Sequence, residues 1–184
     1  MASERAWFSA AADVIQYLPT AEVAVTSLYP LFCSTLSRFQ QFIINEIFVF
    51  TMFSHISVGT SNLSRATEFY TAVLSSLELV PRLVTPDGGP LSSCWISKSS
   101  VIPRFYVYEP FNGKAASVGN GVMIAFLAPV ASAVDQAYKK ALEFGGIGEG
   151  EPSERAHYGV GYYGAYFRDL DGNKIHIAYR GDLL

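Results

Sequence analysis

Histidine, cysteine and charged side chains are scarce in this sequence. Its 184 residues include three histidines and two cysteines, and 16% of the residues are charged. Cys33 and Cys94 form no CxxC pair, which excludes a disulfide scaffold and is typical of a reducing compartment. With so few imidazoles and thiols, any metal site would have to draw on a small set of ligands.

Neither sign of charge dominates the chain. The 13 Lys and Arg residues face 16 Asp and Glu residues, which gives a net charge of -3. No basic stripe is present that could neutralise phosphates, so we expect no nucleic-acid partner. Half of the residues are apolar and 14% are aromatic. This composition is ample for a packed core and predicts a folded domain.

The N-terminal region, residues 1–51, lacks a long apolar run. Its longest uncharged stretch, residues 23–37, contains Pro30 and is shorter than the roughly 18–20 residues that a membrane-spanning helix needs. Asp13 and Glu22 interrupt the apolar segment that a secretory signal would require. We therefore expect no membrane span, no secretion and a cytoplasmic location.

The role and order of residues 1–51 stay open at this stage. Arg5 and the Ala and Ser content are compatible with a mitochondrial presequence, but the four acidic residues of this region do not favour one. Apolar residues recur at helical spacing across residues 39–50, which is typical of an amphipathic helix that docks on the domain or on a partner. An arm without fixed structure is the alternative.

From Met52 onward the sequence repeats itself. Residues 54–58 are typical of a strand and residues 63–77 of an amphipathic helix. The same pattern returns with a strand at residues 122–126 and a second helix that contains Val134, Ala137, Tyr138, Ala141 and Leu142. His55 aligns with Met123 in this repeat.

Three strand-like segments follow each helix. They lie at about residues 78–84, 92–97 and 104–109 in the first half, and at 148–151, 164–168 and 174–179 in the second. Tyr106 then aligns with His176. These patterns predict an α+β fold over residues 52–184, with two βαβββ modules at 52–109 and 121–181. We expect the modules to form a curved mixed sheet around a central pocket, with the helices outside.

Three segments of the chain resemble a known family. The segments SHISVGTSNLSRATEFYTAVL, GNGVMIAFLAP and HYGVGYYGAYFRDLDGNKIHIAYR are similar to the glyoxalase, bleomycin-resistance and extradiol-dioxygenase group, the vicinal oxygen chelate (VOC) superfamily. The resemblance covers residues 52–181 and implies the paired-module fold, a small-molecule pocket and a homodimer. We interpret Asp169, Asp171 and Asn173 in the last segment as turn formers rather than catalytic groups.

In metal-dependent members of this family, the four positions related by the duplication supply the ligands. The resemblance maps these positions onto His55, Tyr106, Met123 and His176. It implies that His55 and His176 are the candidate ligands for a divalent ion such as Zn, Ni, Fe or Mn. A thioether is a poor ligand for these ions and a phenol is not a default one, so we expect Met123 and Tyr106 to line the pocket.

The four residues also bear on the reaction. They contain no carboxylate, so the 2-His-1-carboxylate site of an iron dioxygenase is not assembled and ring cleavage is disfavoured. A glyoxalase I reaction needs a metal and a carboxylate base, and these residues do not provide the base. Neither activity transfers cleanly from the family to this chain.

Residues 157–164 form a glycine-rich aromatic segment. Its side chains include His157, Tyr158, Tyr162 and Tyr163. One interpretation is a lid or wall for an aromatic ligand, with His157 as an acid or base near neutral pH. The alternative is an ordinary turn followed by core tyrosines.

The sequence therefore favours a glyoxalase-like protein that acts on or binds a small organic molecule. Aromatic compounds are among the candidate ligands. If it is an enzyme, which we favour, we expect lyase or isomerase chemistry in which His55, His176 or His157 moves a proton, with a weakly held divalent metal or none. The alternative is a non-catalytic protein that sequesters its ligand, as bleomycin-resistance proteins do.

Overall fold

The repeat read from the sequence is present in the computed structural model, which describes residues 52–183. The predicted helix at residues 39–50 lies outside the described residues, as does the rest of the N-terminal extension. Within the described range, no helix is long and apolar enough to cross a membrane.

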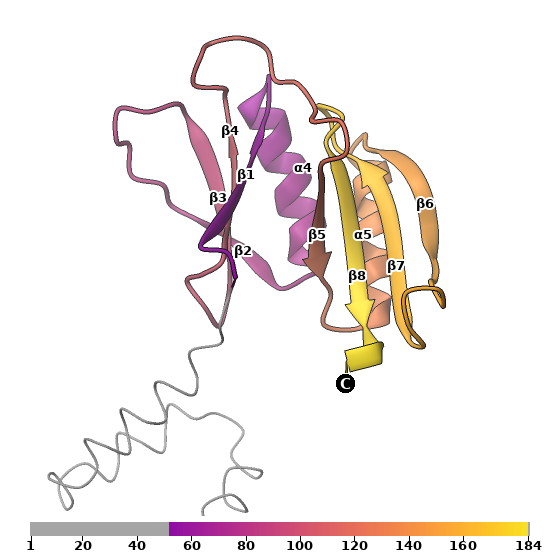
Figure 1. Cartoon of the computed structure of the whole chain (residues 1–184). Helices are drawn as coiled ribbons and strands as arrows, with labels where there is room; N and C mark the ends of the chain where they lie inside the picture. The colour runs from indigo at the N-terminus through magenta and orange to yellow at the C-terminus, as the bar shows by residue number, and fades with distance from the viewer. Residues whose placement is uncertain (1–51, 184) are drawn as a thin grey trace, which may run out of the picture. The chain divides into compact units, whose positions relative to one another are not determined.

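Each half of the domain contributes four strands and one helix (Figure 1). The first half contains β1 (His55–Gly59), α4 (Leu63–Ser75), β2 (Leu79–Arg82), β3 (Ser92–Ser97) and β4 (Arg104–Tyr108). The second half contains β5 (Met123–Leu127), α5 (Ala131–Glu143), β6 (Ile147–Glu154), β7 (Tyr162–Arg168) and β8 (Lys174–Arg180), and a 3-10 turn η1 (Gly181–Leu183) follows. The predicted α+β fold with two βαβββ modules is confirmed.

The strands divide into two mixed sheets, one for each half. Their strand orders are β1-β4-β3-β2 and β5-β8-β7-β6, so the opening strand of each half is an edge strand. In each sheet the opening strand pairs in parallel with the last one, and Ser57 lies opposite Tyr106 as Ala125 lies opposite His176. The register therefore agrees with the sequence alignment that made Tyr106 and His176 equivalent.

Both helices cover the same side of the sheets, and the opposite side is free of helices (Figure 1). Helix α4 begins after Asn62, whose side-chain oxygen accepts a hydrogen bond from the Arg65 amide at 3.1 Å, which satisfies one of the free amides at the helix start. The apolar faces of the helices pack on alternate strand residues. The largest buried side chains are Phe69, Tyr70, Trp95 and Phe167, and burying each such side chain stabilises the fold by about 1.5–3 kcal/mol.

The turn between β7 and β8 joins the two halves. Asp171 accepts hydrogen bonds from the Thr60 hydroxyl at 2.6 Å and from the Ser61 amide at 2.8 Å. Asn173 donates its side-chain amide to the Gly59 carbonyl at 3.2 Å. These residues do shape the turn, as predicted, and they also bind the end of β1.

Strand β7 begins at Tyr162, two residues before the start of the strand predicted at residues 164–168. Because side chains alternate along a strand, Tyr162 faces the helix-free side and Tyr163 the helix side. The aromatic segment is therefore a turn at residues 156–161 that leads into a strand. Its tyrosines do not all share one surface.

Candidate functional site

The helix-free face is defined by the strand residues that point away from α4 and α5. Paired residues on neighbouring strands point to the same face, and the register places most of the predicted site residues there. The facing positions include His55, Ser57, Arg104 and Tyr106 in the first half, and Met123, Ala125, Tyr162, Gly164, Tyr166, Arg168, Lys174, His176 and Arg180 in the second. We call this surface the helix-free face.

His176, on β8, lies against aromatic rings of β7. Its imidazole is nearly parallel to the ring of Tyr166, with centroids 4.1 Å apart, and to the ring of Tyr162, at 5.9 Å. The histidine is 2% exposed. The Tyr166 ring thus covers one face of the imidazole, and Tyr162, whose hydroxyl is 2.9 Å from Nε2, lies at the edge of the ring.

Both nitrogens of His176 are engaged in hydrogen bonds. Nδ1 is 2.9 Å from the Ala165 carbonyl oxygen, which can only accept, so Nδ1 carries a proton. Nε2 is 2.9 Å from the Tyr162 hydroxyl and, in the neutral ring, accepts its proton. Burial lowers the pKa of His176 from its usual value of 6.5, and Arg155 and Lys174 lower it further, against the effect of the Ala165 hydrogen bond.

Gly164 provides the space that the imidazole occupies. A Cβ atom at this position would lie 2.5 Å from Cε1 of His176 and 3.1 Å from the Ile177 carbonyl oxygen. The side-chain-free residue between Tyr162 and Tyr166 therefore lets the histidine ring lie flat against β7. This requirement explains one of the glycines in the aromatic segment.

Tyr158 extends the stack toward solvent. Its ring centroid is 5.2 Å from that of Tyr162, and it is 56% exposed. Burial, followed by a hydrogen bond with Tyr158, raises the pKa of Tyr166 to about 12. His157 is exposed and lies 4.0 Å from Tyr158, centroid to centroid. We call Tyr158, Tyr162, Tyr166 and His176 the aromatic cluster.

The first half presents a smaller group on the same face. His55 is exposed and contacts the edge of the Tyr106 ring, with centroids 5.9 Å apart. Its Nδ1 is 2.9 Å from the Ser54 hydroxyl. Arg104 donates a hydrogen bond to the Tyr106 hydroxyl at 3.2 Å. His55 and Tyr106 are therefore brought together, as the repeat predicted.

The four mapped positions do not fit a divalent metal. His176 has no free lone pair, because one nitrogen carries a proton and the other accepts from Tyr162. Met123 offers a thioether, and the Tyr106 hydroxyl already accepts from Arg104. Within residues 52–183, no three His, Cys, Asp or Glu side chains gather as a metal-binding group. Among the mapped positions, His55 is the imidazole with a nitrogen, Nε2, that no described residue hydrogen-bonds.

Tyr163 lies apart from the other predicted pocket residues. Its hydroxyl donates a hydrogen bond to Asp135 of α5 at 2.8 Å, and its ring packs against the core on the helix side. Burial and this carboxylate raise its pKa. Tyr163 connects β7 to α5 and is not part of the helix-free face.

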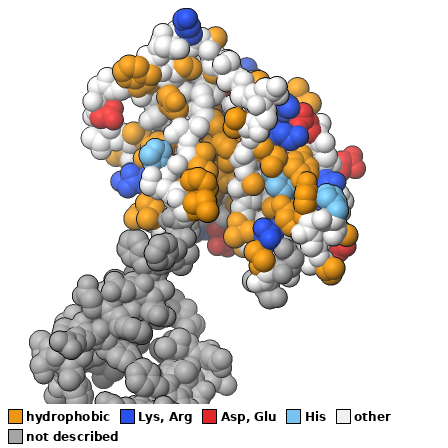
Figure 2. All heavy atoms as spheres, viewed as in Figure 1, with side chains coloured by type: hydrophobic (Ala, Val, Ile, Leu, Met, Phe, Trp, Pro, Cys, Tyr) orange, Lys and Arg blue, Asp and Glu red, His pale blue; other side chains and the backbone are white. Residues whose placement is uncertain are grey.

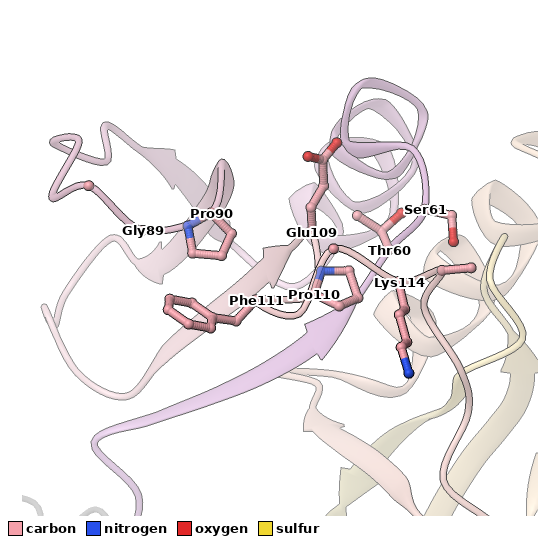
Figure 3. Close-up of a pocket in the computed structure, with 11 residues that line it drawn as sticks. Thr60, Ser61, Gly89, Pro90, Glu109, Pro110, Phe111 and Lys114 are labelled. Atoms are coloured by element: carbon pink, nitrogen blue, oxygen red, sulfur yellow. The ribbon is translucent and has the colours of Figure 1, made fainter.

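A cleft of about 680 Å³ opens at the end of β1 and β4 rather than over the aromatic cluster. Glu109, Phe111 and Lys114 are among the residues that line it. Figure 3 shows that the carboxylate of Glu109 and the ammonium of Lys114 point in different directions. The charged groups therefore do not converge on a common point.

The sequence did not reveal Tyr166 as a site residue, nor the cations around it. Arg155 lies 5.2 Å and Lys174 5.5 Å from the Tyr166 ring centroid. Alternation along β7 from Tyr162 would have placed Tyr166 on the same face as His176. Arg155 follows β6, and its position depends on the conformation of the turn between β6 and β7. No sequence pattern predicts that position.

Comparisons with known proteins agree with this architecture. Residues 52–177 match the model of the Glyoxalase/Bleomycin resistance protein/Dioxygenase superfamily. A glyoxalase/bleomycin resistance protein from Albidiferax ferrireducens is 31% identical, with a TM-score of 0.61, over 71% of this chain and 99% of that one. No curated protein matches the chain.

More distant structures share the fold. The hypothetical protein SA1046 from S. aureus is 22% identical with a TM-score of 0.50, over 72% of this chain and 98% of that one. A glyoxalase-related enzyme from Fulvimarina pelagi is 17% identical with a TM-score of 0.51, over 68% and 86%. With its family model covering both modules, the chain belongs to the Glyoxalase/Bleomycin resistance protein/Dioxygenase superfamily.

Proposed function

We propose that this protein binds a small planar organic molecule on its helix-free face. The observation that carries the proposal is the aromatic cluster. Its tyrosines, Tyr158, Tyr162 and Tyr166, lie next to one another or to the buried His176, and each keeps part of its surface accessible to solvent. Tyrosine rings offer a flat apolar surface and a polar tip, which suits stacking against a planar ligand.

The fixed geometry of the cluster supports this function. His176 is hydrogen-bonded at both nitrogens, to Tyr162 and to the Ala165 carbonyl. Because the rings are held in place before a ligand arrives, binding costs less side-chain entropy than it would on mobile side chains. His176 acts here as a positioning residue for the two tyrosines.

His55 supports a second candidate, acid–base catalysis on the bound molecule. Its side chain is exposed, and its Nδ1 is held by the Ser54 hydroxyl, while no described residue hydrogen-bonds Nε2. This nitrogen is available to take or give a proton at a substrate atom, without a metal-dependent step. We assign this role to His55 rather than to His176, because both nitrogens of His176 are already hydrogen-bonded.

A binding experiment tests the first proposal. Planar aromatic compounds and saturated ring compounds of similar size are added to the full chain, and tyrosine ring signals are followed by NMR. We expect the aromatic compounds to shift signals of Tyr158, Tyr162 or Tyr166 and the saturated ones to do so much less. Shifts confined to Tyr138, on α5, would contradict the proposal.

Two substitutions separate the binding protein from the enzyme. Tyr158→Ala should weaken binding in either case, because it removes an exposed ring of the cluster. His55→Gln should spare binding and abolish turnover only if His55 moves a proton. A homodimer stays a prediction, which light scattering coupled to size-exclusion chromatography would test.

A further inference from the structure

Cations lie beside the aromatic cluster, although the whole chain carries a net charge of -3. The helix-free face has basic side chains at Arg104, Arg168, Lys174 and Arg180, and Arg155 follows β6 beside the cluster. Figure 2, which views this face, shows Lys and Arg side chains around an area of hydrophobic side chains. Two of the cations, Arg168 and Lys174, are paired with Glu149 at 2.6 and 3.2 Å.

Within the described residues, 52–183, neither Arg104 nor Arg155 forms an ion pair with a carboxylate. Arg104 donates to the Val101 carbonyl and to the Tyr106 hydroxyl, both at 3.2 Å. Arg155 donates one hydrogen bond to the Glu151 carbonyl at 3.0 Å. Each guanidinium has five N–H donors, so both retain donors for an outside acceptor.

The cations are placed against the rings that would contact a planar ligand. Arg155 and Lys174 lie over the Tyr166 ring, and Arg180 lies 5.0 Å from the centroid of Tyr162. Guanidinium groups recognise carboxylates through two parallel hydrogen bonds and also stack on aromatic faces. A molecule that covers these rings therefore meets positive charge at its edge.

We propose that the ligand of the helix-free face is a planar organic anion, such as an aromatic carboxylate. This inference rests on the proposed function, because it assigns a charge to the molecule that the aromatic cluster binds. The rings hold the planar body, and Arg155, which lies over the Tyr166 ring, pairs with the carboxylate. A neutral molecule would leave this guanidinium without a counter-charge, and a cation would be repelled.

Three probes with the same ring system test the charge. 2-Naphthoate, 2-naphthamide and 2-naphthylmethylammonium are titrated into the full chain by calorimetry, at low salt and at about 0.5 M NaCl, where screening is strong. We expect naphthoate to bind about tenfold more tightly than the amide at low salt. That preference should shrink at high salt, and the ammonium should bind most weakly.

Charge-removing variants locate the site. Arg155→Gln should reduce naphthoate affinity at least about threefold and leave amide affinity nearly unchanged. Lys139→Gln is the matched control, because Lys139 is on α5 and exposed, and its loss changes the net charge equally. Circular dichroism checks that each variant is folded.

The outcomes distinguish this inference from the proposed function. If none of the probes binds, both are overturned. If the amide or the ammonium binds as tightly as naphthoate, the assignment of a negative charge to the ligand is wrong, whereas the proposal of an aromatic binding site is still supported. If naphthoate is preferred but Lys139→Gln weakens its binding as much as Arg155→Gln does, the anion binds outside the aromatic cluster and the inference is overturned.

Discussion

Tyr70 on α4 and Asp169 in the β7–β8 turn connect the two halves of the domain through a hydrogen bond of 2.7 Å. Both residues are buried, with 1% and 5% exposure. The same carboxylate accepts from the Asn173 amide at 2.7 Å and from the Asp171 amide at 3.0 Å. One side chain therefore closes the turn of the second half and anchors it to the helix of the first.

Tyr70→Phe should destabilise the domain by about 1–3 kcal/mol, because a buried carboxylate loses one of its donors. Urea unfolding of the full chain measures this change. Tyr138→Phe is the matched control, since Tyr138 occupies the equivalent position of α5 and no described residue hydrogen-bonds its hydroxyl. We expect a clearly smaller loss there. Equal losses would show that ring packing, not the hydrogen bond to Asp169, governs the effect.

Tyr70 also makes the stability depend on alkaline pH. Burial, followed by the charge and hydrogen bond of Asp169, raises its pKa well above the usual value of 10.0. The stability that Tyr70 contributes is present below about pH 10 and is lost as the pH rises further, because the unfolded chain then ionises first. Unfolding midpoints at pH 8 and above pH 10 should differ less in Tyr70→Phe than in the natural sequence. An unchanged difference would contradict this prediction.

His176 produces the opposite dependence on the acid side. Its pKa is lowered by burial, so the folded state favours the neutral imidazole. The resulting stability is present above about pH 6.5 and is lost as the pH falls through the lowered pKa. Between pH 7.5 and pH 5 we expect the natural sequence to lose more stability than His176→Gln does. A parallel loss in both proteins would mean that carboxylates alone cause it.

Gly164→Ala should displace His176 from the aromatic cluster. The added methyl group would lie 2.5 Å from its Cε1 atom, and overpacking of this kind costs about 1–3 kcal/mol. Thermal unfolding gives the loss, and tyrosine NMR signals report the opened stack. Gly59→Ala is the control, because its methyl group would meet Ala116 at an ordinary 3.4 Å. Similar losses for both variants would contradict a specific role for Gly164.

Added metal should not act through His176. Its two nitrogens are occupied, so Zn²⁺ or Ni²⁺ should change the melting temperature of the natural protein and of His176→Gln by the same amount. Elemental analysis of protein purified without chelator provides a second measurement. A stoichiometric metal that disappears in both His55→Ala and His176→Gln would overturn this expectation.

Much of the architecture could be predicted from local patterns. Alternating strands and the 3.6-residue period of the helices predict two equivalent modules, and the repeat alone pairs Tyr106 with His176. Strands and helices can be predicted in this way because their patterns depend on neighbours along the chain. The start of β7 was harder to predict, since the glycines near Tyr162 suggested a loop where the strand had already begun.

The sequence by itself determined the duplicated fold, the family resemblance and the face on which His55 and His176 lie. Only the tertiary structure decided that His176 is closed by Tyr162 and Tyr166, and that Asp169 binds Tyr70 across the domain. The physical reason is that period and propensity act between near neighbours, whereas ring stacking and buried hydrogen bonds depend on atoms that folding alone brings together.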